Sequence, residues 1–426
     1  MVRSRVPLEP WRKNLYIMWL SQFIAMAGMS LVVPFLPFFV RDLGVSDADE
    51  VARWSGYVFA GPFFVSFFLI PVWGYLGDRY GRKIMVVRAI FGLAISQALI
   101  GLSQNVEMLF LFRMLQGAIS GFISAALALV SANTPREKAG YAIGVLQTST
   151  ASGQVIGPMI GGTLADFIGI RPIFFIVAVL CTLAGALVFA TVRETSPISP
   201  HEGRAHSFMS NYRHAFSSRE LRVALVLIFV TQAAILLVNP IFALYVEYLE
   251  PVQVYLATIA GTVFSVAGLF MVFSSPWWGK RADAQGYRKN LALAIAGATI
   301  AYIAQGLVTR AWHLIPLRAL QGFCMGGIIP ILYSYVSKRT ELSRRGGLMG
   351  IASSSYILAS MVGPTLGGQL AAAIGLRANF FVAGGLLLVA LLVVQTVFVD
   401  IHGPARHAGA GADPVLAESA PPAEPD

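Results

Sequence analysis

The sequence predicts an all-α membrane protein whose twelve transmembrane helices form two six-helix repeats. The first observation is composition: 56% of the residues are hydrophobic and 12% are charged, whereas soluble domains carry roughly 25% charged residues. The mean hydropathy is +0.70. The second observation is that apolar runs of membrane-spanning length recur along the chain. The third is that blocks of sequence recur at a nearly constant spacing, which indicates duplication.

Each transmembrane helix is predicted from a run of roughly 18 or more residues with few charges, which is long enough to cross a bilayer. The twelve runs lie at about 14–40, 53–76, 84–103, 107–131, 140–165, 171–193, 221–248, 252–279, 289–308, 312–338, 345–371 and 376–399. The predicted organisation is a cytoplasmic segment (1–13), an N-terminal six-helix bundle (14–193), a cytoplasmic linker (194–220), a C-terminal six-helix bundle (221–399) and a disordered cytoplasmic tail (400–426).

The distribution of basic residues predicts the orientation. An even number of spans places both termini on one side, and 23 of the 31 Lys and Arg residues lie on that side, with five on the other and three within spans. By the positive-inside rule the termini are cytoplasmic. The net charge of +10 then reflects topology, and no nucleic-acid partner is expected. The basic N-terminus leads directly into the first span, so no cleavable signal peptide is predicted.

Enzyme chemistry is not indicated by the residue pattern. Cys181 and Cys324 lie within apolar runs, where small buried side chains are more common than a disulfide or a metal pair. All six histidines lie in loops or the tail. No Gly-x-x-x-x-Gly-Lys-Ser/Thr loop for phosphate binding occurs, so ATP is not the direct energy source. We expect no enzymatic activity, no cofactor and no metal.

The two halves repeat at residue level. At an offset of 205, GYLGDRYGRK (74–83) aligns with GKRADAQGYRK (279–289) and FRMLQG (112–117) with LRALQG (317–322); at 206, GPMIGG (157–162) aligns with GPTLGG (363–368) and IGIRPIFF (168–175) with IGLRANFF (374–381). Parallel six-span repeats build one large class of secondary transporters, in which the substrate site lies between the halves near the bilayer midplane.

These blocks, with three longer stretches, identify a family resemblance. The stretches are LVVPFLPFFV (31–40), WSGYVFAGPFFVSFFLIPVWGYLGDRYGRK (54–83) and GQVIGPMIGGTLAD (153–166). From about 14 to 400 the chain resembles the major facilitator superfamily, and within it the twelve-span drug:proton antiporters. The resemblance implies a monomeric protein of a bacterial inner membrane that exports small amphipathic drugs in exchange for protons. Two alternatives stay open: transport of a defined metabolite such as a sugar or lipid, or a membrane sensor that does not transport.

The block at 74–83 is expected to form the cytoplasmic loop between spans two and three, with tight turns at its glycines. The resemblance implies a conformational latch in which Asp78 faces the start of span eleven, because the positive N-terminal end of a helix favours an anion. The alternative is a solvated basic loop. The latch residues are Gly74, Asp78, Arg79, Gly81, Arg82 and Lys83, and the second-half copy keeps Gly279, Asp283 and Gly286 but lacks both arginines.

Span five carries glycines four residues apart, a spacing that lets another helix approach closely, and a proline that tends to bend the helix. The resemblance identifies this block as the antiporter motif of the family. Its residues are Gly153, Gly157, Pro158, Gly161 and Gly162, and the second-half copy is Gly363, Pro364, Gly367 and Gly368. Hinge packing and direction-specific coupling both remain open as its role.

Polar or soft side chains that share a helical face are candidate substrate contacts, because amides offer neutral hydrogen bonds and methionine adapts to varied apolar ligands. They are Gln22, Met26 and Met29 in span one, Gln147 and Gln154 in span five, Gln232 and Asn239 in span seven, and Tyr356 in span eleven. Ordinary contacts between helices are the alternative for each. No acidic residue lies in the middle of spans one, four or seven, which argues against selection of cations.

Arg113 is a permanent cation inside span four, and Arg318 occupies the matching place in span ten. Ionisable residues at such depth usually face the bundle interior or a wet cavity, although an arginine near the rim can also extend its side chain outward. The resemblance associates Arg113 with the proton path. Together with Asp78 and Glu247 it forms the set of proton path candidates.

Overall fold

The computed structural model describes residues 9–119, 121–194, 208–251, 254–341 and 343–398. The predicted disordered tail, most of the predicted N-terminal segment and half of the predicted linker lie outside these residues. The described residues form helices and loops, with no strand among them. The all-α prediction is therefore confirmed.

The described residues of the first half form ten helical elements. They are α1 (Pro10–Val32), η1 (Val33–Phe35), α2 (Leu36–Asp42), α3 (Ala48–Tyr80), α4 (Arg82–Gly101), α5 (Val106–Ile119), α6 (Phe122–Asn133), η2 (Arg136–Lys138), α7 (Ala139–Ile168) and α8 (Ile170–Thr191).

The second half repeats the order of the long helices after an additional short helix, with its fourth span unbroken as α14. Its elements are α9 (Phe208–Ser217), α10 (Arg219–Val238), η3 (Asn239–Ile241), α11 (Phe242–Leu249), α12 (Leu256–Gln285), α13 (Tyr287–Leu307), η4 (Ala311–His313), α14 (Leu314–Lys338), α15 (Arg345–Ile374) and α16 (Leu376–Thr396).

Eleven helical segments in the described residues are long and apolar enough to cross a membrane. Spans one, four and seven are each interrupted: α1 continues through η1 into α2, α5 into α6, and α10 through η3 into α11. The fifth predicted span, α7, is 30 residues long but is not among the eleven, because glycine, serine, threonine and glutamine lower its hydropathy. Its composition suits a helix that contacts other helices more than lipid.

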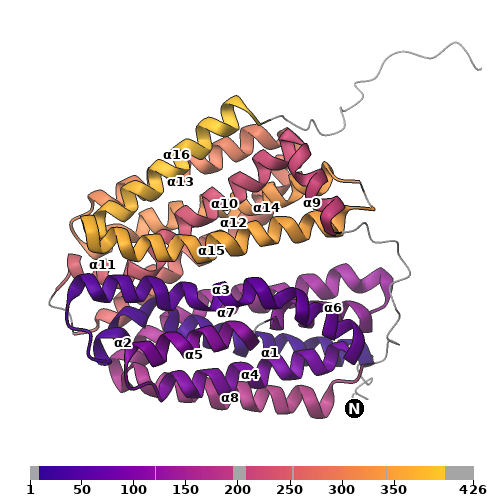
Figure 1. Cartoon of the computed structure of the whole chain (residues 1–426), viewed down its shortest axis with the longest axis horizontal. Coiled ribbons are helices and arrows are strands. Elements are labelled where there is room, and N and C mark those ends of the chain that lie inside the picture. Colours follow the sequence, from indigo (N-terminus) through magenta and orange to yellow (C-terminus); the bar gives the residue numbers. More distant parts are fainter. Residues whose placement is uncertain (1–8, 120, 195–207, 252–253, 342, 399–426) are drawn as a thin grey trace, which may run out of the picture.

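The helices of each half pack mainly with one another, and four long helices make most of the contact between the halves. Figure 1 shows α3 and α7 on the side of the first half that faces the second, beside α15 and α12, whereas α4 and α8 lie on the outer side. In the second half α13 and α16 are outermost. We call the end at which α1 begins and α16 finishes the termini end, and the end that carries α2 and α11 the far end.

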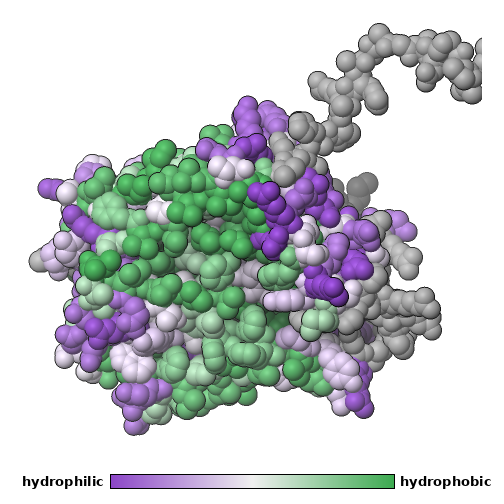
Figure 2. Space-filling view, turned by 45° about the horizontal axis from the view of Figure 1, so that its top comes forward, coloured by the Kyte–Doolittle hydropathy of each residue, from purple (hydrophilic) through white to green (hydrophobic). Residues whose placement is uncertain are grey.

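A broad apolar surface lies between the two polar ends of the molecule (Figure 2). Large hydrophobic side chains are exposed on the molecule, among them Phe68, Leu183 and Phe273. A soluble protein rarely exposes such a large apolar patch, because contact with water costs free energy. This surface matches the hydrocarbon region of a bilayer, so the structure agrees with the membrane prediction.

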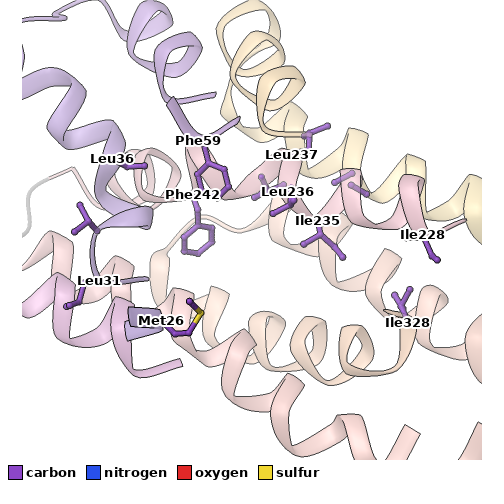
Figure 3. Packing of buried hydrophobic residues seen from close by; sticks show 14 of the residues in the cluster. Met26, Leu31, Leu36, Phe59, Ile228, Ile235, Leu236, Leu237, Phe242 and Ile328 are labelled. Carbon is purple, nitrogen blue, oxygen red and sulfur yellow. The ribbon is translucent and has the colours of Figure 1, made fainter. Parts of the chain in front are cut away.

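One cluster of buried apolar residues runs through both halves, and some of its members lie near the far end. Phe59 of α3, Leu36 of α2 and Phe242 of α11 belong to it, and Figure 3 labels them together with Leu236 and Leu237 of α10. The halves are therefore joined by packed apolar side chains as well as by the polar contacts described below.

The internal repeat extends to individual hydrogen bonds. The Trp73 indole donates to the carbonyl of Ala118, and 205 residues later the Trp278 indole donates to the carbonyl of Phe323, both at 2.7 Å. Each bond joins the second long helix of its half to the span-four position. The duplication predicted from sequence blocks therefore appears in the packing.

The predicted tight turns of the 74–83 block are only partly present. Gly74 and Gly77 remain within α3, and the chain turns at Gly81, whose φ is +99°. The second-half copy behaves alike, because Gly279 is helical in α12 and Gly286, at φ +95°, ends that helix. The expectation of a turn at every glycine was wrong: the helix tolerates glycine, and only the positive φ requires it.

Candidate functional site

Arg113 is buried between α5 and α3, with 7% of its surface exposed. Its Nε donates to the carbonyl of Val58 at 3.1 Å and its Nη1 to Oε1 of Gln116 at 2.6 Å. The helices approach this closely because Gly117 lies directly against the backbone of Pro62, leaving no room for a Cβ. None of the ion pairs among the described residues involves Arg113. It is held by neutral acceptors.

Arg318 repeats this arrangement between α14 and α12, with 3% of its surface exposed. Its Nη1 donates to Gln321 at 3.0 Å and its Nε to the carbonyl of Val263 at 3.5 Å, 205 residues after Val58. The guanidinium also lies 4.3 Å from the ring centroid of Phe242, a favourable cation–π distance. The two arginines thus form a structural pair, and neither extends its charge to the rim.

The antiporter motif presents two faces of α7 to two different helices. Gly153, Gly157 and Gly161 face α1 within the same half, and a Cβ on Gly157 would lie 2.6 Å from Cβ of Ser30. Gly162 instead faces the backbone of Ala257 at the start of α12, in the other half. The motif therefore packs one half internally and also forms the contact between the halves.

Pro158 completes the second face. Its carbonyl lies against Gly261 of α12, at a distance that leaves no room for a Cβ there. Pro158 and Gly162 are one helical turn apart, so both point toward the same neighbour.

The second-half copy makes the mirror set of contacts. Gly363 and Gly367 face α10, whereas Pro364 and Gly368 face α3, where a Cβ on Gly56 would lie 2.6 Å from the carbonyl oxygen of Pro364. Contacts α7–α12 and α15–α3 are therefore related by the repeat. Glycine is needed at each of these two contacts because the backbones of the facing helices touch and leave no room for a side chain.

Polar contacts between the halves gather at the far end. Asp166, near the end of α7, accepts hydrogen bonds from the amides of Ala257 at 3.1 Å and Thr258 at 2.7 Å and from the Thr258 hydroxyl at 2.7 Å. Arg41 forms a two-pronged ion pair with Glu247, whose Nη1–Oε1 distance is 2.8 Å. Glu247, a proton path candidate, is thus neutralised by the other half in this conformation.

One further bond crosses between the halves at the same end: Gln369 of α15 donates to the hydroxyl of Tyr57 in α3. At the termini end, Gly74 of α3, Gly144 of α7 and Gly350 of α15 each face open space. The hydrogen bonds and the ion pair that join the described residues of the two halves lie at the far end.

The latch block lies at the termini end. Arg79 is exposed, and the side chain of Asp78 lies outside what the structure describes. Its second-half counterpart Asp283 pairs within its own half with Lys338, at 2.8 Å.

A carboxylate that the sequence reading did not single out holds the start of α4. Glu194 accepts hydrogen bonds from the backbone amides of Arg82 and Lys83, both at 3.1 Å, and lies beside Gly81. These are free donors at a helix N-terminus. Only its place just after the sixth span could have pointed to it, because its partners are more than a hundred residues away in sequence.

The predicted contacts of span one face a neighbouring helix. Gln22 is fully buried and donates to Thr150 at 2.6 Å, and Met26 packs against Gly153. Met29 is partly buried against the apolar core. In this conformation Gln22 and Met26 contact α7, so their role as substrate contacts stays a prediction: periodicity identified one face, and that face contacts α7.

The open face of α1 consists of side chains that the sequence reading missed. Tyr16 and Leu20 are exposed. Trp19 and Phe23 stack with ring centroids 5.5 Å apart, and the Trp19 indole donates to the hydroxyl of Thr148 in α7. The spacing of Trp19 and Phe23, one helical turn, was the available signal.

Span five keeps its two predicted amides accessible. Gln147 and Gln154 are exposed. They lie on the opposite side of α7 from the exposed apolar residues Ile156, Met159 and Ile160. Because Gly157 and Gly162 occupy the directions toward α1 and α12, the amides point between these helices, into the space between the halves.

In the second half Tyr356 of α15 interacts with Gln232 of α10 and Tyr333 of α14. Tyr333 in turn interacts with Ser353. These side chains bring three helices together in a neutral polar cluster. Asn239 is the first residue of η3, where the α-helix changes to a 3₁₀ turn. It is therefore not held to the α-helical spacing that would place it on the same face as Gln232.

The fold, the repeated arginines and the two-faced motif define a transporter of the major facilitator type, and the family comparison agrees. A family model described as Major Facilitator Superfamily matches residues 18–304 and 254–422, so the chain belongs to that family. Relatives include multidrug resistance proteins MdtG of Salmonella arizonae and Salmonella typhimurium, each 36% identical over 393 residues, which cover 91% of this chain and 96% of the relative.

Solved structures support the fold at much lower identity. A bacterial homolog of the human lysosomal transporter Spinster, in an inward-facing and unoccupied conformation, superimposes with a TM-score of 0.73 at 17% identity, covering 91% of this chain and 98% of that one. The nucleoside transporter NupG gives 0.74 at 12% identity, covering 91% and 98%.

Proposed function

We propose that this chain is a proton-driven exporter of small amphipathic compounds that works by alternating access. The observation that carries the proposal is one-sided closure: the halves meet at the far end through glycine contacts, Asp166 and the Arg41–Glu247 pair. At the termini end no hydrogen bond or ion pair joins the described residues of the two halves. A site between the halves is then accessible from one side of the membrane at a time.

Orientation gives this closure a direction. The excess of basic residues at the termini end makes that end cytoplasmic by the positive-inside rule. The conformation described above is then inward-facing, ready to receive a compound from the cytoplasm or the inner leaflet. A bacterial inner membrane is the corresponding location, and the multidrug resistance names of the relatives support it.

The exposed and partly exposed side chains of α1 and α7 favour neutral or weakly polar compounds with aromatic or apolar parts. Trp19, Phe23 and Tyr16 offer ring surfaces, and Gln147 and Gln154 offer donors and acceptors without charge. Such groups recognise many amphipathic shapes with little selectivity, because stacking and amide hydrogen bonds are adaptable.

Proton coupling is the part of the proposal that rests on Arg113. The guanidinium is buried on neutral acceptors here, so a carboxylate that comes near it in another conformation gains a strong partner and changes its proton affinity. Asp78 lies in the same helix as Val58 and about 30 Å further along it at 1.5 Å per residue. It is therefore a candidate through the start of α15, where the outward-facing state would bring it, and not through contact with Arg113. Glu247, already paired with Arg41, is the candidate at the far end.

The test is transport in bacteria stripped of their own drug pumps. Cells expressing the chain should retain less of at least one dye or drug than cells with an empty vector, and an uncoupler should remove the difference. Asp78→Asn should abolish export, whereas the matched change Asp283→Asn should leave most of it, because Asp283 already pairs within its own half.

Two results would count against the proposal. If no compound in a broad panel changes its accumulation, drug export is refuted, and binding of a sugar or lipid in a thermal-shift screen would favour the metabolite alternative. If Asp78→Asn and Arg113→Ala both leave a clear phenotype intact, a sensor that does not transport is favoured.

A further inference from the structure

We infer that Asp166 is a gate residue that holds the far end shut by capping a helix of the other half. It belongs to α7 of the first half, yet its carboxylate accepts the amides of Ala257 and Thr258 in the first turn of α12. The inference rests on the proposed alternating access, and it adds a residue to which neither the latch nor the antiporter motif assigns a role.

The first turn of α12 depends on this contact. The residue at its own N-cap position, Tyr255, makes no side-chain hydrogen bond to the helix. Unpaired amides at a helix start need acceptors, and a negative charge there is favoured by the helix dipole. Asp166 supplies both, and the Thr258 hydroxyl adds a third donor at 2.7 Å. The cap is therefore complete only when the two halves are together.

Gly162 makes the reach of Asp166 possible. It lies one helical turn before Asp166 and has backbone of α12 directly against it. A side chain at position 162 would hold α7 away from α12 and would draw the carboxylate out of hydrogen-bonding distance. The glycine and the aspartate therefore act as one unit, the first through shape and the second through charge.

Water can reach this contact. A cavity of about 250 Å³ lies beside it between the halves. Its lining includes Asp166 and Ala257 together with the charged side chains of Arg41, Asp42 and Glu247. When the halves separate, water can replace the lost partners of both the carboxylate and the amides. The gate can thus open without leaving a bare charge in lipid.

The experiment measures the distance between the halves in the purified full chain. Spin labels on cysteines at Ser46 and Thr309 report the far end, and labels at Ser131 and Ser343 report the termini end; all four positions are exposed. Cys181 and Cys324, both buried, are first replaced by alanine. Asp166→Asn should raise the ratio of far-end-open to far-end-closed molecules on the order of tenfold, because charge-assisted bonds are lost.

Asp47→Asn is the matched control. Asp47 caps α3 within its own half by accepting from the amide of Glu50 at 2.9 Å. Asp47 is also a carboxylate that caps a helix at the far end. Asp47→Asn should therefore lower thermal stability slightly without changing either distance distribution. Thr258→Val, which removes one of three bonds, should shift the ratio in the same direction as Asp166→Asn but less, and Asp166→Glu should restore part of the closed population.

The gate is refuted if Asp166→Asn leaves both distance distributions unchanged, or if Asp47→Asn shifts them equally. If Asp166→Asn does not fold, Thr258→Val decides alone. The readout needs no transported compound, so its failure leaves the proposed drug export to its own assay. Failure of that assay in turn leaves the gate measurable.

Discussion

Gly56→Ala should favour the far-end-open state without disrupting either half. A Cβ at this position would lie 2.6 Å from the carbonyl oxygen of Pro364 and 3.1 Å from Cα of Gly368, both backbone atoms of α15. Ordinary contact begins at 3.4 Å, so α3 and α15 must move apart by roughly 1 Å. Overpacking of this size costs about 1–3 kcal/mol.

The cost falls on one conformation only, because the two helices separate at this end when the far end opens. The ratio of open to closed molecules should therefore rise by roughly 5- to 30-fold for 1–2 kcal/mol. The assay is the far-end distance distribution between spin labels at Ser46 and Thr309, measured with and without Gly56→Ala.

Gly157→Ala is the control, since its Cβ would also lie 2.6 Å from a neighbour, the Cβ of Ser30. That contact is within one half and persists in both conformations, so this variant should lower the melting temperature and leave the ratio unchanged. Both changes replace glycine inside a helix, so the gain in helix propensity cancels between them. The reasoning fails if Gly157→Ala shifts the ratio or if Gly56→Ala does not.

Three further predictions follow from the same contacts. Gly162→Ala should shift the distance distributions in the same direction as Gly56→Ala, because it occupies the repeat-related contact between α7 and α12; an opposite shift would contradict the symmetry. Glu194→Ala should destabilise the chain by about 1 kcal/mol in thermal unfolding, as loss of a helix cap does, and an unchanged melting temperature would argue against its role. Gln154→Ala should raise KM for an exported compound with little loss of stability, whereas Gln22→Ala should mainly lower stability because it leaves Thr150 without its donor; the reverse pattern would show that the buried face of α1 binds substrate.

The fold was predictable because a bilayer imposes a strong pattern on sequence. Long apolar runs, the position of the arginines and the repeated blocks were sufficient for the helical order and for the family. Repetition also predicted that Arg113 and Arg318 share one environment, and both bind a valine carbonyl 205 residues apart.

The partners of each residue were not predictable in the same way. Glycine spacing predicted close packing in α7, but only the structure separates Gly157, which faces α1, from Gly162, which faces α12. The same limit explains Gln22, because helical periodicity groups residues by face and does not say which neighbour covers that face. Asp166 looked like an ordinary charge near a span end, since its partners lie 91 and 92 residues later.

The most direct test of the central claim is drug uptake into inside-out membrane vesicles with an imposed pH gradient. Acid inside and neutral outside reproduces the direction in which protons would leave in exchange for drug. The account predicts that vesicles with the wild-type chain accumulate an amphipathic dye only while the gradient lasts, and that vesicles with Arg113→Ala do not. Accumulation that is equal with and without the gradient, or equal in the two proteins, would contradict it.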